Sequence, residues 1–139
     1  MEKKDLKPAG VFKYFEEICQ VPRPSKKEEK IIAYLKAFGA KHNLETNVDE
    51  AGNVLIKKPA TPGKENLQTV ILQSHIDMVC EKNNDVQHDF LTDPIETEID
   101  GEWLKAKGTT LGADNGIGVA TQSWRMTTSS TARWNACLP

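Results

Sequence analysis

The amino-acid sequence predicts an α/β fold, because segments with helical spacing of apolar residues alternate with short strands. Residues 69–74 form a nearly continuous apolar run, which is typical of a central strand covered on both faces. The chain has 139 residues, enough for one ordinary domain but few strands for an α/β hydrolase core. We therefore expect an incomplete α/β domain.

Two amphipathic helices are predicted near the N-terminus. The first has apolar residues at helical spacing over residues 11–19 and ends before the prolines of segment 22–24. The second follows Ser25, which we interpret as its N-cap, and Glu28 would complete a capping box. We expect this helix to end near residues 42–43.

Two hairpins are predicted from alternating strands that flank turn residues. The first joins residues 45–48 and 54–57, and the second joins residues 95–99 and 103–107. A Gly-rich turn over residues 109–118 then leads into a helix that begins near Asp114.

Composition excludes several classes of partner. The net charge of −2 provides no basic field for nucleic acid. Neither the charged N-terminus nor any later segment has an apolar run long enough to span a bilayer, so no membrane partner is expected. The three cysteines are widely spaced, which indicates free thiols rather than disulfides or a CxxC zinc site. We predict a cytoplasmic protein.

Chemically useful side chains follow the apolar strand. His75 can offer a ring nitrogen to a metal, and Asp77 points the same way along an extended chain because side chains alternate with period two. A carboxylate beside a metal-binding imidazole typically holds its other N–H. Asp114 offers two oxygens that could bridge two divalent ions. A metal site built from these residues is one hypothesis.

Each pattern by itself has another interpretation. A histidine at a strand end is often a hydrogen-bonded structural residue. The segment Gly112-Ala113-Asp114-Asn115-Gly116 also fits a calcium-like or a simple turn. Only their combination, at a strand end and at a Gly-rich helix start, favours a metal site.

Longer segments carry a family resemblance. They are VPRPSKKEEKI (21–31), GNVLIKKPAT (52–61) and the stretch from Ser74 to Ala120, which includes HDF and GTTLGADNG. Together they closely resemble the aminoacyl-histidine dipeptidases, which are Xaa-His or cytosol non-specific dipeptidases of the di-zinc metallopeptidases. The resemblance implies the N-terminal part of a zinc-exopeptidase (phosphorylase/hydrolase-like) catalytic domain.

The resemblance also implies roles for individual residues. His75 and Asp114 correspond to metal ligands, with Asp114 bridging two zinc ions, and Asp77 to the catalytic-site carboxylate that orients His75. The peptide bond after the bridging aspartate is typically cis in this family. The implied cofactor is zinc, although manganese or cobalt would suit the same ligands. The implied partner is a small dipeptide substrate, and a homodimer is compatible with the family.

Complete members of this family contain further functional residues that the chain lacks. These are a consecutive Glu pair, which supplies a general base and a ligand, and then an aspartate and a histidine ligand. With His75 and Asp114 alone, each zinc would have at most two protein ligands, and no general base would be present. We therefore expect no dipeptidase activity from this chain alone. The alternative is a non-catalytic fragment or interaction module with residual metal binding.

Residues 123–139 differ from the rest in composition. They contain no acid, two of the three tryptophans and six Ser or Thr residues. The same nucleotides, read two bases further along, can encode LADDDFIHGPLECL, which resembles the next segment of the family. We predict that residues 1–122 are part of the catalytic domain and that residues 123–139 form an aberrant, frameshifted, disordered tail. A natural tail that packs its tryptophans is the alternative.

Overall fold

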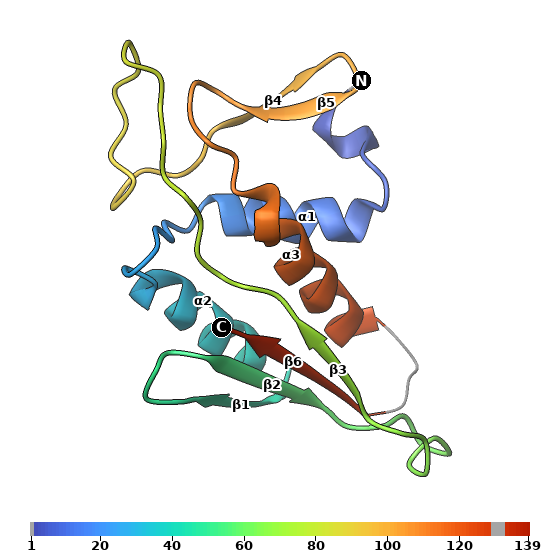
Figure 1. Ribbon diagram of the computed structural model, residues 1–139. Helices are drawn as coiled ribbons and strands as arrows, with labels where there is room; N and C mark the ends of the chain where they lie inside the picture. The colour runs from blue at the N-terminus through green and yellow to red at the C-terminus, as the bar shows by residue number, and fades with distance from the viewer. Residues whose placement is uncertain (1, 129–132) are drawn as a thin grey trace.

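The computed structural model describes residues 2–128 and 133–139. Over these residues the chain forms a mixed α/β fold (Figure 1). The helices are the 3-10 helix η1 (Lys3–Asp5), α1 (Ala9–Cys19), α2 (Glu29–Lys41) and α3 (Ala113–Thr128). The strands are β1 (Glu45–Val48), β2 (Val54–Lys58), β3 (Val70–Gln73), β4 (Thr97–Asp100), β5 (Trp103–Ala106) and β6 (Trp134–Leu138).

The strands form two separate sheets. Four of them lie in the order β1-β2-β6-β3, in which β6 runs antiparallel to β2 and parallel to β3. Strands β4 and β5 form an antiparallel hairpin of their own. Figure 1 shows α1 between this hairpin and the four-stranded sheet, with α3 packed across α1.

One hydrophobic core joins the helices to the four-stranded sheet. Apolar side chains at helical spacing on α1 and α2 are buried, as the sequence predicts. They meet alternate side chains of β2 and β6, which point to the same face of the sheet. The core includes Phe15, Ile18, Ile31, Leu35, Val54, Ile56, Ala136 and Leu138.

Both predicted hairpins are confirmed. In the first, β1 pairs with β2, and Gly52 adopts a φ of 91° in the turn, where a residue without a Cβ is favoured. In the second, Gly101 has a φ of 61° between β4 and β5. The predicted free thiols are also confirmed at all three cysteines.

The predicted N-cap at Ser25 is wrong. Helix α2 begins only at Glu29, and Glu28 takes the N-cap position without a side-chain cap. The Ser25 hydroxyl instead donates a hydrogen bond to Oδ2 of Asp77. A distant carboxylate therefore engages the hydroxyl that the local sequence pattern assigned to the helix.

The apolar strand β3 is not covered on both faces. It lies at an edge of the sheet and pairs only with β6 among the described strands. Val70 is 40% exposed and Ile71 is 66% exposed. The apolar run that predicts a central strand therefore forms an open edge in this chain.

Within the segment 123–139, for which the sequence predicts a disordered tail, the structure describes residues 123–128 and 133–139. Residues 123–128 continue α3, and Trp134–Leu138 form β6 between β2 and β3. Ala136 and Leu138 are buried, which follows the period-two pattern of a strand with one face in a core. Arg125 also stacks on Trp134, with its guanidinium carbon 4.9 Å from the ring centroid. No helix among the described residues is long and apolar enough to cross a membrane.

Candidate functional site

His75 and Asp114 meet at the ends of two elements. His75 follows β3 by two residues, and Asp114 lies in the first turn of α3. Nε2 of His75 is 3.0 Å from Oδ1 of Asp114. The backbone of Asp114 is non-helical, and its peptide bond to Asn115 is cis, as the family resemblance implies. The structure thus brings together the two residues that the sequence predicts as metal ligands.

Asp77 holds the second nitrogen of the same ring. Nδ1 of His75 lies 3.0 Å from Oδ1 of Asp77 and 3.2 Å from its backbone oxygen. The other carboxylate oxygen, Oδ2, accepts the hydrogen bond from Ser25. Both oxygens of Asp77 are therefore engaged, and the imidazole lies between two carboxylates. A carboxylate in this position can fix the orientation and tautomer of an imidazole.

The surroundings shift the pKa values of both groups. Partial burial lowers the pKa of His75, but hydrogen bonds to Asp114 and Asp77 outweigh burial and leave this pKa above its ordinary value. The hydrogen bond from Ser25, followed by the contact with His75, holds the pKa of Asp77 below its usual range. The negative charge around the ring therefore favours a positive charge at this position.

A buried arginine lies beneath these side chains. Arg23 is 2% exposed, and its Nη1 donates to the carbonyl oxygens of Ile76 and Asp77 at 3.2 and 3.3 Å. Its Nη2 donates to the carbonyl oxygen of Gly112 at 2.7 Å. Burial lowers the pKa of Arg23. One guanidinium therefore contacts both segments that carry the candidate ligands.

Neither Arg23 nor Ser25 is identified as a site residue by sequence reasoning. Their segment is interpreted only as a break between helices and an N-cap. The one available signal is that Arg23 stands between Pro22 and Pro24, where a charged residue cannot lie on the wet face of a helix. Its partners are backbone carbonyls far along the chain, and no sequence pattern reveals them.

The candidate residues border an open hollow. Its volume is about 470 Å³, and it is lined by parts of segments 75–79 and 110–114. Asp114 reaches into solvent here, since its side chain is 96% exposed. The side chains of His75 and Asp114 both line the hollow and are 43% and 96% exposed.

The described residues supply only part of a metal site. Over residues 2–128 and 133–139, no group of three or more His, Cys, Asp or Glu side chains is arranged to hold a metal ion. The donor chemistry suits zinc, because an imidazole nitrogen and a carboxylate oxygen are both ordinary zinc ligands. The number of donors does not suffice, because a catalytic zinc normally has three protein ligands.

The other two histidines do not join this site. His88 packs against Phe90 with ring centroids 4.5 Å apart, and its Nε2 is buried without a hydrogen-bond partner. His42 packs against Phe38 at 4.7 Å. Both rings therefore make packing contacts with an aromatic neighbour.

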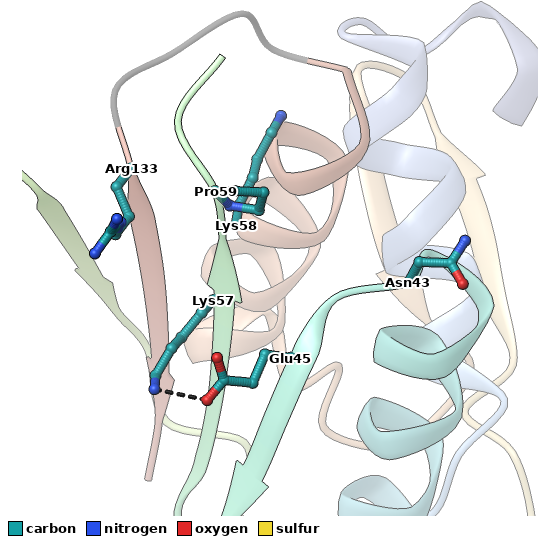
Figure 2. A pocket seen from close by; sticks show the side chains of 6 residues that line it. All are labelled: Asn43, Glu45, Lys57, Lys58, Pro59 and Arg133. Carbon is teal, nitrogen blue, oxygen red and sulfur yellow. Dashed lines mark hydrogen bonds and ion pairs between the residues drawn. The ribbon is translucent and has the colours of Figure 1, made fainter. Parts of the chain in front are cut away.

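A second hollow, of about 440 Å³, lies beside β1, β2 and β6 (Figure 2). Lys57 is paired there with Glu45, with Nζ 2.7 Å from Oε1. Figure 2 shows that Lys58 and Arg133 point in different directions, and Nζ of Lys58 donates to the carbonyl of Arg125 at 3.3 Å. These cations do not converge on one point, so the hollow is a poor candidate for anion binding.

Comparison with known proteins identifies relatives among the peptidases. The chain is 50% identical over 119 residues to the cytosol non-specific dipeptidase of Escherichia coli (strain K12). The match covers 86% of this chain and 24% of that protein. No protein-family model matches the chain.

Solved structures agree with this match. The crystal structure of aminoacylhistidine dipeptidase from Vibrio alginolyticus superposes with a TM-score of 0.93 at 47% identity, over 99% of this chain and 29% of that one. A tripeptidase from Staphylococcus aureus superposes with a TM-score of 0.73 at 17% identity, which shows a shared fold alone, over 93% of this chain and 35% of that one.

The chain thus spans only 24% and 29% of the lengths of the two dipeptidases it matches. The resemblance and the fold class predicted from the sequence are both confirmed. Over most of its length, the chain is a homologue of the cytosol non-specific and aminoacylhistidine dipeptidases, and its mixed α/β fold corresponds to the N-terminal part of these peptidases.

Proposed function

We propose that this chain carries part of the metal site of a cytoplasmic dipeptidase of the Xaa-His type and is inactive alone. The observation that supports this most is the contact of the His75 ring with two carboxylates, Asp77 on Nδ1 and Asp114 on Nε2. A metal-binding histidine characteristically has its outer nitrogen toward the metal and its inner nitrogen held by a carboxylate.

The three residues have separate roles in this proposal. His75 and Asp114 are the protein ligands that this chain provides, and zinc is the preferred ion, with manganese or cobalt as substitutes. Asp77 fixes the ring orientation and the tautomer that leaves Nε2 free to bind. When bound, such an ion polarises the scissile carbonyl and acidifies a water molecule. Asp114, whose carboxylate lies at the open hollow, would serve as the ligand shared by the ions.

Inactivity follows from the number and kind of groups present. Two donors leave a zinc ion short of the three protein ligands of a catalytic site. Among the described residues that line the hollow, the one further carboxylate is Asp77, whose two oxygens are engaged by His75 and Ser25 and so are not free to take a proton from water. The chain alone should therefore bind zinc weakly and leave dipeptides intact.

A different class of function also agrees with this geometry. A chain with a half-built site and an open sheet edge could serve as a non-catalytic interaction module with residual metal binding. The exposed apolar residues Val70 and Ile71 on β3 favour this alternative. Neither function predicts turnover by this chain alone, so hydrolysis of a dipeptide would contradict both.

The test combines binding with turnover. Zinc affinity is measured by titration calorimetry for the natural chain, His75→Ala and Asp114→Asn, with His42→Ala as the matched histidine control. Release of free histidine from an Xaa-His dipeptide is measured with zinc, manganese or cobalt, before and after treatment with a chelator.

We expect weak zinc binding that His75→Ala and Asp114→Asn remove and His42→Ala retains, without turnover. Turnover that a chelator abolishes and zinc restores would show that the chain is an enzyme by itself. Absence of zinc binding, or binding that survives both site substitutions, would contradict the assignment of His75 and Asp114.

A further inference from the structure

We propose that Arg23 is the positioning residue of this site: its buried guanidinium joins the segment of His75 and Asp77 to the segment of Asp114 and thereby sets the spacing of the two ligands. The inference rests on the proposed function for what the site binds. The spacing itself is a property of the chain and can be tested without a metal.

The two arms of the guanidinium contact different parts of the chain. Nη1 donates to the carbonyl oxygens of Ile76 and Asp77, and Nη2 donates to that of Gly112, two residues before Asp114. Arginine presents its donors in a rigid planar fork, so the positions of the two groups of acceptors are fixed relative to each other. A lysine, with a single ammonium, has no such fork.

The exposed contact between the ligands cannot set this spacing. The side chains of His75 and Asp114 are 43% and 96% exposed, so water competes for their 3.0 Å contact. Arg23 is 2% exposed, and its donors would be costly to leave unpaired in the core. The buried guanidinium therefore determines the geometry of the exposed pair.

Glycine residues make room for the guanidinium. A Cβ added at Gly112 would lie 2.6 Å from Nη2 of Arg23, and one at Gly116 would lie 2.7 Å from the same atom. Both distances are below ordinary contact. The Gly-rich turn thus allows the guanidinium to approach the backbone on both sides of Asp114. This close approach is a reason for glycine at positions 112 and 116 that is separate from the start of the helix.

The segment around Arg23 is also bound to the His75 segment through its backbone. N–H of Met78 donates to the carbonyl of Arg23 at 3.0 Å, and N–H of Ser25 donates to that of Met78 at 3.3 Å. The Ser25 hydroxyl then engages Asp77. Segment 23–25 therefore positions the orienting carboxylate as well as the ring that it orients.

The first experiment measures how strongly Asp114 affects the ring nitrogens of His75 in the absence of metal. Ring nitrogen resonances of His75 are recorded by NMR at one alkaline pH, at which the ring is neutral, with and without Asp114→Ala. We expect Asp114→Ala to shift Nε2 in the natural chain and to have at most about a fifth of that effect in Arg23→Lys. An equal shift in both backgrounds would overturn the positioning role, as would the lack of any shift in the natural chain.

A second pair of variants tests the same contact if Arg23→Lys does not fold. Gly112→Ala places a Cβ 2.6 Å from Nη2 of Arg23 and 2.7 Å from Sδ of Met78, whereas Gly101→Ala meets no atom within 4 Å. The two glycines have φ of 68° and 61°, so both variants carry similar backbone strain. We expect only Gly112→Ala to uncouple Asp114 from His75. If Gly101→Ala uncouples them equally, or if both Arg23→Lys and Gly112→Ala unfold, Arg23 serves fold stability rather than positioning.

Metal binding separates this inference from the proposed function. Cobalt is titrated into each variant while its visible absorption is followed, and we expect roughly ten-fold weaker binding in Arg23→Lys and Gly112→Ala than in Gly101→Ala. Equal affinity in all variants, with loss in His75→Ala, would refute positioning and leave the function intact. If no variant binds cobalt, the proposed function fails, and the ring resonances alone decide the role of Arg23.

Discussion

The four-stranded sheet and the site at the end of β3 are held together by different kinds of contact. In the sheet, β6 pairs along β2 and β3 through backbone hydrogen bonds, and its alternate side chains enter the core. At the site, the side chains of Arg23 and Ser25 donate to backbone carbonyls and to the carboxylate of Asp77.

This difference determines how many amino-acid substitutions each region tolerates. A backbone ladder accepts any residues whose alternation suits its two faces, because the paired groups are common to nearly all amino acids. The site contacts require one planar fork and one hydroxyl at fixed positions. The strand β6 can therefore tolerate many substitutions that keep its alternation, whereas the site cannot tolerate loss of the fork or the hydroxyl.

The largest effect on stability is expected for a substitution in the four-stranded sheet. Leu138 in β6 is 2% exposed, so Leu138→Ala should lower the free energy of unfolding by about 2–5 kcal/mol through lost burial and a cavity. Denaturant unfolding measures this loss. Leu67→Ala is the control, because Leu67 is 55% exposed and its truncation should cost less than about 0.5 kcal/mol. Equal effects of the two variants would show that β6 does not contribute to the core.

A smaller effect is expected at the site. Ser25→Ala removes the hydrogen bond that does most to lower the pKa of Asp77, so this pKa should rise toward its ordinary value. Because the folded pKa is depressed, the associated stability is present above about pH 4 and is lost as the pH falls through the folded pKa. The loss at neutral pH should be about 1 kcal/mol or less, because Asp77 is partly exposed.

Carboxyl NMR titration measures the shift caused by Ser25→Ala. Asp49 provides an internal control, since hydrogen bonds from Asn53 lower its pKa in the first hairpin, away from the site. Its titration should be unchanged. A constant Asp77 pKa in Ser25→Ala would mean that the hydroxyl does not hold the carboxylate.

A charge placed on the open edge of β3 should change self-association but not stability. Ile71→Lys places a charge on an exposed edge position and should alter the free energy of unfolding by less than about 0.5 kcal/mol. It should reduce self-association, because a charged edge strand resists pairing with another chain. Light scattering after size-exclusion chromatography measures this at rising concentration. Gln87→Lys adds the same charge on an exposed loop, and an equal reduction there would point to net charge rather than the edge.

Thiol reactivity compares the buried and half-buried cysteines without any substitution. Cys19 in α1 is 1% exposed, and burial raises its pKa to about 12, so at pH 8 it should not react while the protein is folded. Cys80 and Cys137 are half-buried and should react in the folded chain. A disulfide reagent that releases a coloured thiolate counts the groups before and after denaturation. Three fast thiols in the folded protein would contradict the burial of Cys19.

The sequence by itself determined the local elements of this protein. Helical spacing predicted α1, alternation predicted both hairpins, and His75 with Asp114 appeared as a pair because each stands at the end of an element. These features depend on contacts within a few residues or on a repeating period, and both are visible in a linear sequence. The family resemblance added the identity of the pair as ligands, which remains a proposal.

Only the tertiary structure decided which segments became neighbours. Ser25 engages Asp77, 52 residues away, instead of capping α2. Arg23 lies between segments that are 53 and 89 residues distant from it. The apolar strand β3 becomes an edge, and β6 enters the sheet, because pairing partners depend on the whole set of available strands. Such long-range contacts follow from packing and backbone satisfaction in the assembled core, for which no local pattern in the chain provides a signal.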